Sequence, residues 1–190
     1  MHARWKGQSK YRIDGKIEVA LTGAEFADGM EYGHFVEDQH RGYCVLLYYT
    51  AIRRGEGLKA VKEQFHIGKS AIMFDVAGRF KHSKQTPSLK LPLDAPHMLE
   101  LKKCIEETAD GKRVFPYCGK TGYNIVRRAF KYPHLFRLSR ITKFFTEGYT
   151  IAQLRSWTGL SLAALEYYVG IVDTQKMSDS LAKVEAKSLG

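Results

Sequence analysis

Apolar residues recur every three or four positions along most of this chain, the spacing that predicts helices with one buried side. The stretch 36–52 is apolar on most sides and predicts a buried central helix. The sequence Thr22-Gly-Ala-Glu25 is a capping box that opens a helix ending near residue 32. Further helices are expected over 57–65, 96–108, 121–130, 134–147, 150–157, 161–168 and 174–188.

Two stretches alternate apolar and polar residues instead, which is typical of strands. The first covers 11–19 around the turn pair Asp14-Gly15. The second runs from residue 70 to 76 and resumes at 89–93, so it predicts a hairpin whose loop carries Lys84. The expected fold class is therefore mainly α with a small antiparallel β-sheet (α+β). We divide the chain into a basic, strand-like arm (1–21), one domain (22–171) and a tail helix (172–190).

Composition and charge narrow the partners. The 190 residues are 44% hydrophobic and 12% aromatic, enough for one domain with a single core. The net charge of +10 favours a polyanionic partner, foremost a nucleic acid. An anionic membrane is the rival, but no basic amphipathic segment with an aromatic face stands out. No apolar run approaches the roughly 18 residues of a membrane span, and the charged start lacks a secretory signal, so a cytoplasmic protein is expected.

Several kinds of site find no support in the sequence. Cys44, Cys104 and Cys118 lie far apart and form no CxxC pair, which argues against a disulfide framework or a zinc site and favours buried thiols. The seven histidines show no HxxxH pairing with acidic neighbours. No glycine-rich phosphate loop and no GxSxG elbow is present, which weakens nucleotide-driven and serine-hydrolase interpretations.

Five residues beside turns and helix ends are candidates for chemistry: Arg53, Lys84, His134, Arg137 and Tyr168. Each alone has an ordinary structural explanation. The first would be a cation at a helix end, the second a solvated turn lysine and the third a residue of a helix start. Arg137 would be a surface or ion-paired arginine, and Tyr168 a core aromatic. Their order along the chain and their flanking residues make five independent coincidences improbable.

In that order, the chain resembles the catalytic domain of the tyrosine recombinases, the phage-integrase and Xer-like family. Thr50-Ala-Ile-Arg53 with Glu56 resembles the first arginine box, and His134-Leu-Phe-Arg137 resembles the HxLR box. Lys84, nine residues before the Pro-Leu end of a strand, matches the family's lysine in a β-turn. The resemblance covers about residues 22–172 and looks closest to archaeal or archaeal-virus integrases.

The resemblance implies the fold of these DNA breaking–rejoining enzymes and a site-specific recombinase or integrase activity. Tyr168 is then the nucleophile, with Tyr167 as the alternative. Two guanidiniums, those of Arg53 and Arg137, would stabilise the charge that grows on the attacked phosphodiester. His134 would accept a proton or hold the phosphate, and Lys84 would protonate the leaving 5′ oxygen. Because a covalent 3′-phosphotyrosine conserves the bond energy, neither a metal nor ATP is expected.

Two features depart from the family pattern. Leu160 stands where the family usually has a second histidine, and Trp157 nearby is a candidate to supply an indole N–H instead. Both are also well explained as core residues. The interval from Gly159 to the tyrosine is one residue short if Tyr168 is used and two if Tyr167 is used. Glu56 is expected mainly as a structural partner of a helix or an arginine.

The implied partner is a double-stranded DNA recombination site. The basic residues Arg127, Arg128 and Lys131 either track its phosphates or form a solvated face. A tetrameric synapse is implied, with 172–190 docking on a neighbouring subunit, although a free fragment is expected to be monomeric. The setting would be a mobile genetic element, such as an archaeal virus or plasmid, acting on the chromosome of a prokaryotic or virus-infected cell. Two alternatives stay open: a type IB topoisomerase-like nicking enzyme, and a non-catalytic DNA-binding accessory protein.

Overall fold

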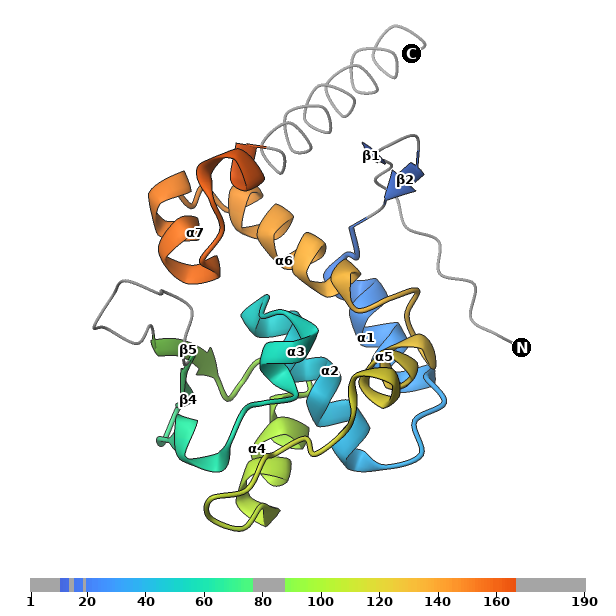
Figure 1. Ribbon diagram of the computed structural model, residues 1–190, viewed down its shortest axis with the longest axis vertical. Coiled ribbons are helices and arrows are strands. Elements are labelled where there is room, and N and C mark those ends of the chain that lie inside the picture. Colours follow the sequence, from blue (N-terminus) through green and yellow to red (C-terminus); the bar gives the residue numbers. More distant parts are fainter. Residues whose placement is uncertain (1–10, 14–15, 19, 77–87, 167–190) are drawn as a thin grey trace, which may run out of the picture.

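The computed structural model of the chain describes residues 11–13, 16–18, 20–76 and 88–166 (Figure 1). The helices are α1 (Gly23–Tyr32), α2 (Asp38–Thr50), α3 (Arg54–Gly57), α4 (Met98–Glu107), α5 (Gly119–Arg127), α6 (His134–Thr146) and α7 (Ile151–Thr158), with a 3-10 turn η1 at Lys62–Gln64. The strands are β1 (Tyr11–Ile13), β2 (Lys16–Glu18), β3 (Phe65–Ile67), β4 (Ala71–Asp75) and β5 (Ser88–Pro92). Residues 162–166 are also helical. This confirms the expected fold class, mainly helical with one small antiparallel sheet.

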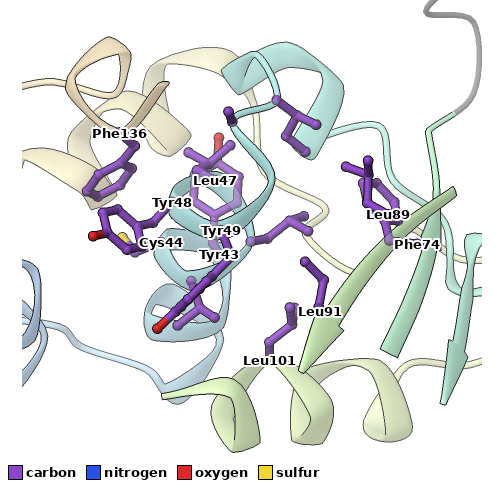
Figure 2. Close-up of a cluster of buried hydrophobic side chains, with 14 of the residues drawn as sticks. Tyr43, Cys44, Leu47, Tyr48, Tyr49, Phe74, Leu89, Leu91, Leu101 and Phe136 are labelled. Atoms are coloured by element: carbon purple, nitrogen blue, oxygen red, sulfur yellow. The ribbon is translucent and has the colours of Figure 1, made fainter. Parts of the chain in front are cut away.

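Helix α2 is the centre of the fold, as its apolar sequence predicts. Every residue from Gly42 to Thr50 is buried, and the helix packs against α3, α4, α5, α6 and β5. Figure 1 shows the sheet on one side of α2 and helices α1, α5 and α6 on the other. Figure 2 shows Tyr48 of α2 beside Phe136 of α6, and Leu101 of α4 beside Leu91 of β5. Each large apolar side chain buried here contributes about 1.5–3 kcal/mol.

Stacked aromatic rings hold α1 and α6 against α2. The ring of Phe26 in α1 lies parallel to that of Tyr48 in α2, with centroids 3.7 Å apart. The edges of Phe136 in α6 meet the same two rings at 5.8 and 6.1 Å. Such offset and edge-to-face pairs add about 0.5–1.5 kcal/mol each beyond the area they bury. These ring contacts fix α6, and with it the first turn of α6, relative to α1 and α2.

The predicted capping box opens α1 as expected. The Thr22 hydroxyl accepts from the Glu25 backbone N–H at 3.1 Å, and the Glu25 carboxylate accepts from the Thr22 N–H at 2.8 Å. Directly before it, the buried Leu21 N–H donates to the Ser139 hydroxyl of α6 at 2.7 Å. The segment entering α1 is therefore tied to α6 by a long-range hydrogen bond as well as by packing.

The sheet has the order β3-β4-β5, and all its pairs are antiparallel. Phe74 of β4 pairs with Phe65 of β3 on one side and Leu89 of β5 on the other. The rings of Phe65 and Phe74 stack at 4.4 Å. The predicted β4–β5 hairpin is confirmed, and so is the short pair β1–β2 around 14–15. The connecting segment 77–87, with Lys84, lies outside the described residues.

One helix prediction was wrong. Instead of a helix over 57–65, the chain forms α3 (Arg54–Gly57) and the turn η1, and then Phe65 begins β3. Leu58, Val61 and Phe65 have helix-like spacing, and this spacing was the reason for the wrong prediction. Their partners are non-local, because Val61 bridges to Arg113 and Phe65 pairs with β4.

The remaining described helices lie within three residues of their expected bounds. Within the described residues, no helix is both long and apolar enough to cross a membrane. The predicted tail helix 174–188 and both candidate tyrosines, Tyr167 and Tyr168, lie outside the described residues. The proposed boundaries at 21 and 171 remain predictions.

Candidate active site

Three residues singled out in the sequence line one pocket of about 300 Å³: Arg53, His134 and Arg137. The first follows α2, and the other two stand on the first turn of α6, more than 80 residues further along the chain. Ile52, Arg54, Tyr123, Tyr132 and Pro133 complete the wall. The packing of α6 on α2 therefore brings these distant segments together.

Arg53 sits at the rim of this pocket. Helix α2 ends at Thr50 and is capped by Ala51, whose left-handed backbone (φ 51°, ψ 23°) turns the chain so that Arg53 can precede α3. Glu56 holds the arginine twice, accepting from its backbone N–H at 2.6 Å and from Nη1 at 3.1 Å. The Arg53 side chain remains 60% exposed. Glu56 thus has the structural role expected for it, as the partner of an arginine.

Arg137 lies deep in the same pocket, only 4% exposed. Its Nη1 donates to the Ala51 carbonyl oxygen, and its Nη2 donates to the Thr158 carbonyl oxygen at 3.0 Å. The interpretation of Arg137 as a surface residue was therefore wrong. One buried guanidinium joins the end of α2 to the end of α7, while exposed His134 stands one turn earlier on α6.

The pocket is strongly cationic. Arg53, Arg54 and Arg137 all line it, and no carboxylate does among the described residues. The Arg54 guanidinium lies 5.8 Å from the ring centre of Tyr123, and that of Arg127 lies 5.9 Å from the same ring. Planar guanidiniums on several sides of a small pocket suit an oxyanion with several acceptor oxygens, such as a phosphate or a phosphodiester.

Trp157 is not among the residues that line this pocket, and its auxiliary role remains a prediction. Its indole N–H donates to the Thr50 carbonyl oxygen at 3.1 Å, and its ring packs 5.0 Å from that of Phe144. Leu160 is half-buried against the core. Both positions agree with the core interpretation, so Trp157 ties α7 to the end of α2.

The basic residues of α5 and its C-terminal end are exposed. Arg127, Arg128 and Lys131 have no carboxylate of a described residue within 4.0 Å.

The expectation of buried thiols holds for Cys44 and Cys104 but is wrong for Cys118, which is exposed at the start of α5. The Thr121 hydroxyl and the nearby backbone N–H groups lower the pKa of the Cys118 thiol.

Sequence reasoning missed three residues of the pocket wall, namely Arg54, Tyr123 and Tyr132. Tyr123 and Arg127 are four apart on α5, so their contact could have been inferred from helical spacing. The approach of Tyr123 to Arg54 could not, because it depends on how α5 packs against α3.

Lys84, Tyr167 and Tyr168 lie outside the described residues, so their roles remain predictions. The described chain reaches Glu166 in the helical stretch 162–166, where Leu165 is fully buried. Among the described residues, no group of three or more histidine, cysteine, aspartate or glutamate side chains is placed to hold a metal ion.

No protein-family model matches this chain, and no curated protein matches it by sequence. Solved structures match by fold. XerA recombinase has a TM-score of 0.65 and 15% identity, over 88% of this chain and 65% of its own. XerH site-specific recombinase, bound to palindromic difH substrate in a post-cleavage complex, has a TM-score of 0.63 and 16% identity, over 87% and 53%. The catalytic domain of bacteriophage HP1 integrase has a TM-score of 0.52 and 15% identity, over 85% of this chain and 93% of its own.

These likenesses show the fold of the tyrosine-recombinase catalytic domain. The chain spans about half the length of the XerH chains (51% and 53%), but almost all (93%) of the HP1 integrase catalytic domain. At identities of 15–16%, these likenesses concern the fold alone.

Proposed function

We propose that this chain is the catalytic domain of a site-specific DNA recombinase or integrase that cuts and rejoins DNA through a covalent 3′-phosphotyrosine. The observation that carries the proposal is the meeting of Arg53, His134 and Arg137 in one cationic pocket. It gains support from the fold and from the net charge of +10, which favours a polyanionic substrate.

The proposed reaction is a transesterification, in which a DNA phosphodiester is exchanged for a phosphodiester between the DNA 3′ end and a tyrosine. The phenolic oxygen of Tyr168, or of Tyr167 in the alternative assignment, attacks the phosphorus. The bond from phosphorus to the 5′ oxygen breaks, which leaves the 3′ phosphate on the tyrosine. His134 accepts the phenol proton, and Lys84 donates a proton to the departing 5′ oxygen. Attack by a free 5′ hydroxyl reverses the step, so the bond energy is conserved without ATP or metal.

The two arginines have different parts in this proposal. Charge grows on the non-bridging oxygens as the phosphorus becomes pentacovalent, and donors already in position there lower the barrier. Arg137 is held by two backbone carbonyls, so its guanidinium occupies a fixed position in the pocket. Arg53, at the rim, would close on the phosphate from the solvent side.

The proposed partner is duplex DNA. XerH was solved on its difH substrate, before and after cleavage. By analogy, this chain would work as a tetramer on two DNA sites, with 172–190 docking on a neighbouring subunit, and would be monomeric without DNA. We place its action on the chromosome of a prokaryotic or virus-infected cell, in the service of a mobile element.

A covalent adduct is the direct test. Because the target sequence is unknown, the substrate is a library of nicked duplexes with randomised sequence, which traps the cleaved strand on the protein. We expect the unmodified chain to give a DNA adduct that survives denaturing electrophoresis, and Tyr168→Phe to give none. An adduct with Tyr168→Phe but not with Tyr167→Phe would move the nucleophile by one residue. DNA binding without any adduct would refute the enzymatic proposal.

The arginines are tested with the sequences recovered from that library. Arg53→Ala and Arg137→Ala should each slow adduct formation by about 10²-fold or more, because a donor to the growing charge is removed. Arg113→Ala is the control, since Arg113 is exposed and does not line the pocket. Cleavage by Arg53→Ala at the unmodified rate would remove that residue from the site.

A further inference from the structure

A second pocket, of about 400 Å³, shares no residue with the candidate active site. It lies where the start of α1, the segment after β5 and the C-terminal half of α6 meet around α2. Its walls are largely aromatic, with Tyr48, Tyr49, Phe144 and Tyr149 among them. Two cations, Arg140 and Lys143, also line it.

Arg140 is the unusual member of this pocket. Its guanidinium carbon lies 4.4 Å from the ring centre of Phe144 and 5.4 Å from that of Tyr49, so two rings flank it. Its Nε is enclosed and has no hydrogen-bond partner among the described residues. Burial lowers the pKa of the Arg140 guanidinium, yet an arginine stays cationic at neutral pH. A desolvated donor without an acceptor is rare in proteins and calls for an explanation.

Glu147 attracts the Arg140 guanidinium electrostatically but forms no ion pair with it. Glu147 lines the same pocket, but its ion pair is with Lys143, at 3.6 Å. No carboxylate of a described residue lies within 4.0 Å of Arg140. The Tyr49 hydroxyl donates to the Pro96 carbonyl oxygen at 3.0 Å and is therefore held in place as part of the wall. Among the described residues, the two cations and one carboxylate of the pocket leave a net charge of +1.

We propose that this pocket binds a carboxylate carried on a flat apolar group, with Arg140 pairing with the carboxylate and the aromatic walls enclosing the apolar group. A planar guanidinium matches a carboxylate through two parallel hydrogen bonds. A single unmatched cation suits a monoanion better than a doubly charged phosphate. Aromatic walls with one convergent polar group are typical of small-ligand sites. The proposal does not depend on the recombinase function, because it concerns a separate pocket.

Calorimetric titration of the full chain with phenylacetate tests it. We expect saturable binding of phenylacetate, and binding of the neutral phenylacetamide and of acetate that is weaker by roughly tenfold or more. Arg140→Met should weaken phenylacetate binding to the same degree. Arg41→Met is the matched control, because Arg41 also lies over a ring, 5.5 Å from the centre of Phe35, but does not line this pocket.

Two peptides decide the source of the carboxylate. A short peptide ending in phenylalanine with a free carboxylate is compared with its C-terminal amide. Tighter binding of the acid form than of phenylacetate supports a protein terminus as the natural ligand, and the reverse supports a small acid. Equal binding of acid and amide, or absence of binding by both acids, would overturn the proposal. This comparison needs only the unmodified chain. It therefore stands even if Arg140→Met does not fold, in which case Arg140→Lys, which lacks the planar pair of donors, replaces it.

Discussion

A single residue, Ala51, sets the position of Arg53. It ends α2 in the left-handed region, at φ 51°, and its carbonyl oxygen accepts from Arg137. Residues with a Cβ avoid this region at a cost of about 1–2 kcal/mol, so glycine usually occupies it. The fold accepts this strain because the turn is buried and fixed on both sides. Ala51 also lies within Thr50-Ala-Ile-Arg53, the segment that resembles the family's first arginine box.

We therefore expect Ala51→Gly to be tolerated better than an ordinary alanine-to-glycine change. Ala27→Gly in the interior of α1 is the control, and it should lower the free energy of unfolding by about 1 kcal/mol. Ala51→Gly also removes a methyl group but relieves the left-handed strain, so its destabilisation should be smaller by about 1–2 kcal/mol. Urea unfolding of the two variants measures the difference. Equal destabilisation would mean that Ala51 is not strained.

Because of His40, the free energy of unfolding should depend on pH. This histidine is buried, and its Nδ1 has no hydrogen-bond partner among the described residues. Burial lowers its pKa, helped by the charge of Arg128 and opposed by that of Glu37. The unfolded chain thus binds the proton more readily than the folded one. The stabilisation is full above about pH 6.5 and is lost as the pH falls through the lowered pKa.

The measurement compares the unmodified chain with His40→Gln. Between about pH 7.5 and about pH 5, the free energy of unfolding should fall more steeply for the unmodified chain. The other histidines are common to both proteins, so their contributions cancel. Parallel curves would contradict a role for His40.

At the scale of elements, the sequence predicted what local patterns control. The helices α1, α2, α4, α6 and α7 and the hairpin β4–β5 followed from apolar spacing and caps. The region 57–65 did not, because β3 exists only through its pairing with β4. The same holds for the candidate active site. Arg53, His134 and Arg137 could be recognised from their order along the chain and from their flanking residues. Tyr123 and Tyr132 were not, since packing alone brings them to the pocket.

Ser139 tests how strongly distant elements are joined. It accepts the buried N–H of Leu21 and donates to the Leu135 carbonyl oxygen at 2.6 Å. Ser139→Ala leaves a buried N–H unsatisfied, so the free energy of unfolding should drop by about 1–3 kcal/mol. Ser156→Ala, on the exposed side of α7, should change it by less than about 0.5 kcal/mol. A similar small effect at both positions would show that Leu21 finds another partner.

At the scale of the molecule, cations are unevenly neutralised. The lysines of α4 are paired, Lys102 with Glu106 at 3.5 Å and Lys103 with Asp38 at 2.7 Å. The exposed Arg127, Arg128 and Lys131 have no such pairs among the described residues. Helix α5, whose Tyr123 lines the candidate active site, therefore places uncompensated cations close to that site.

This asymmetry predicts which lysines and arginines matter for DNA. Replacing Arg127, Arg128 and Lys131 together by glutamine should reduce the slope of log affinity against log salt by about 0.9 for each DNA phosphate that the variant no longer neutralises. Replacing Lys102 and Lys103 by glutamine should leave the slope unchanged. Fluorescence anisotropy with a labelled duplex at several salt concentrations gives both slopes. If the slope falls more for the α4 variant, DNA lies on the opposite side of the fold.

The two arginines of the candidate active site differ in when they become ordered. Arg137 is immobilised by two backbone carbonyls as the chain folds, so its loss of rotamer freedom belongs to folding. Arg53, 60% exposed and held by Glu56, keeps much of its freedom until a ligand arrives. An anion entering the pocket meets one cation already in place and must itself immobilise the other. Of the two arginines, Arg53 should therefore lose more conformational entropy on binding.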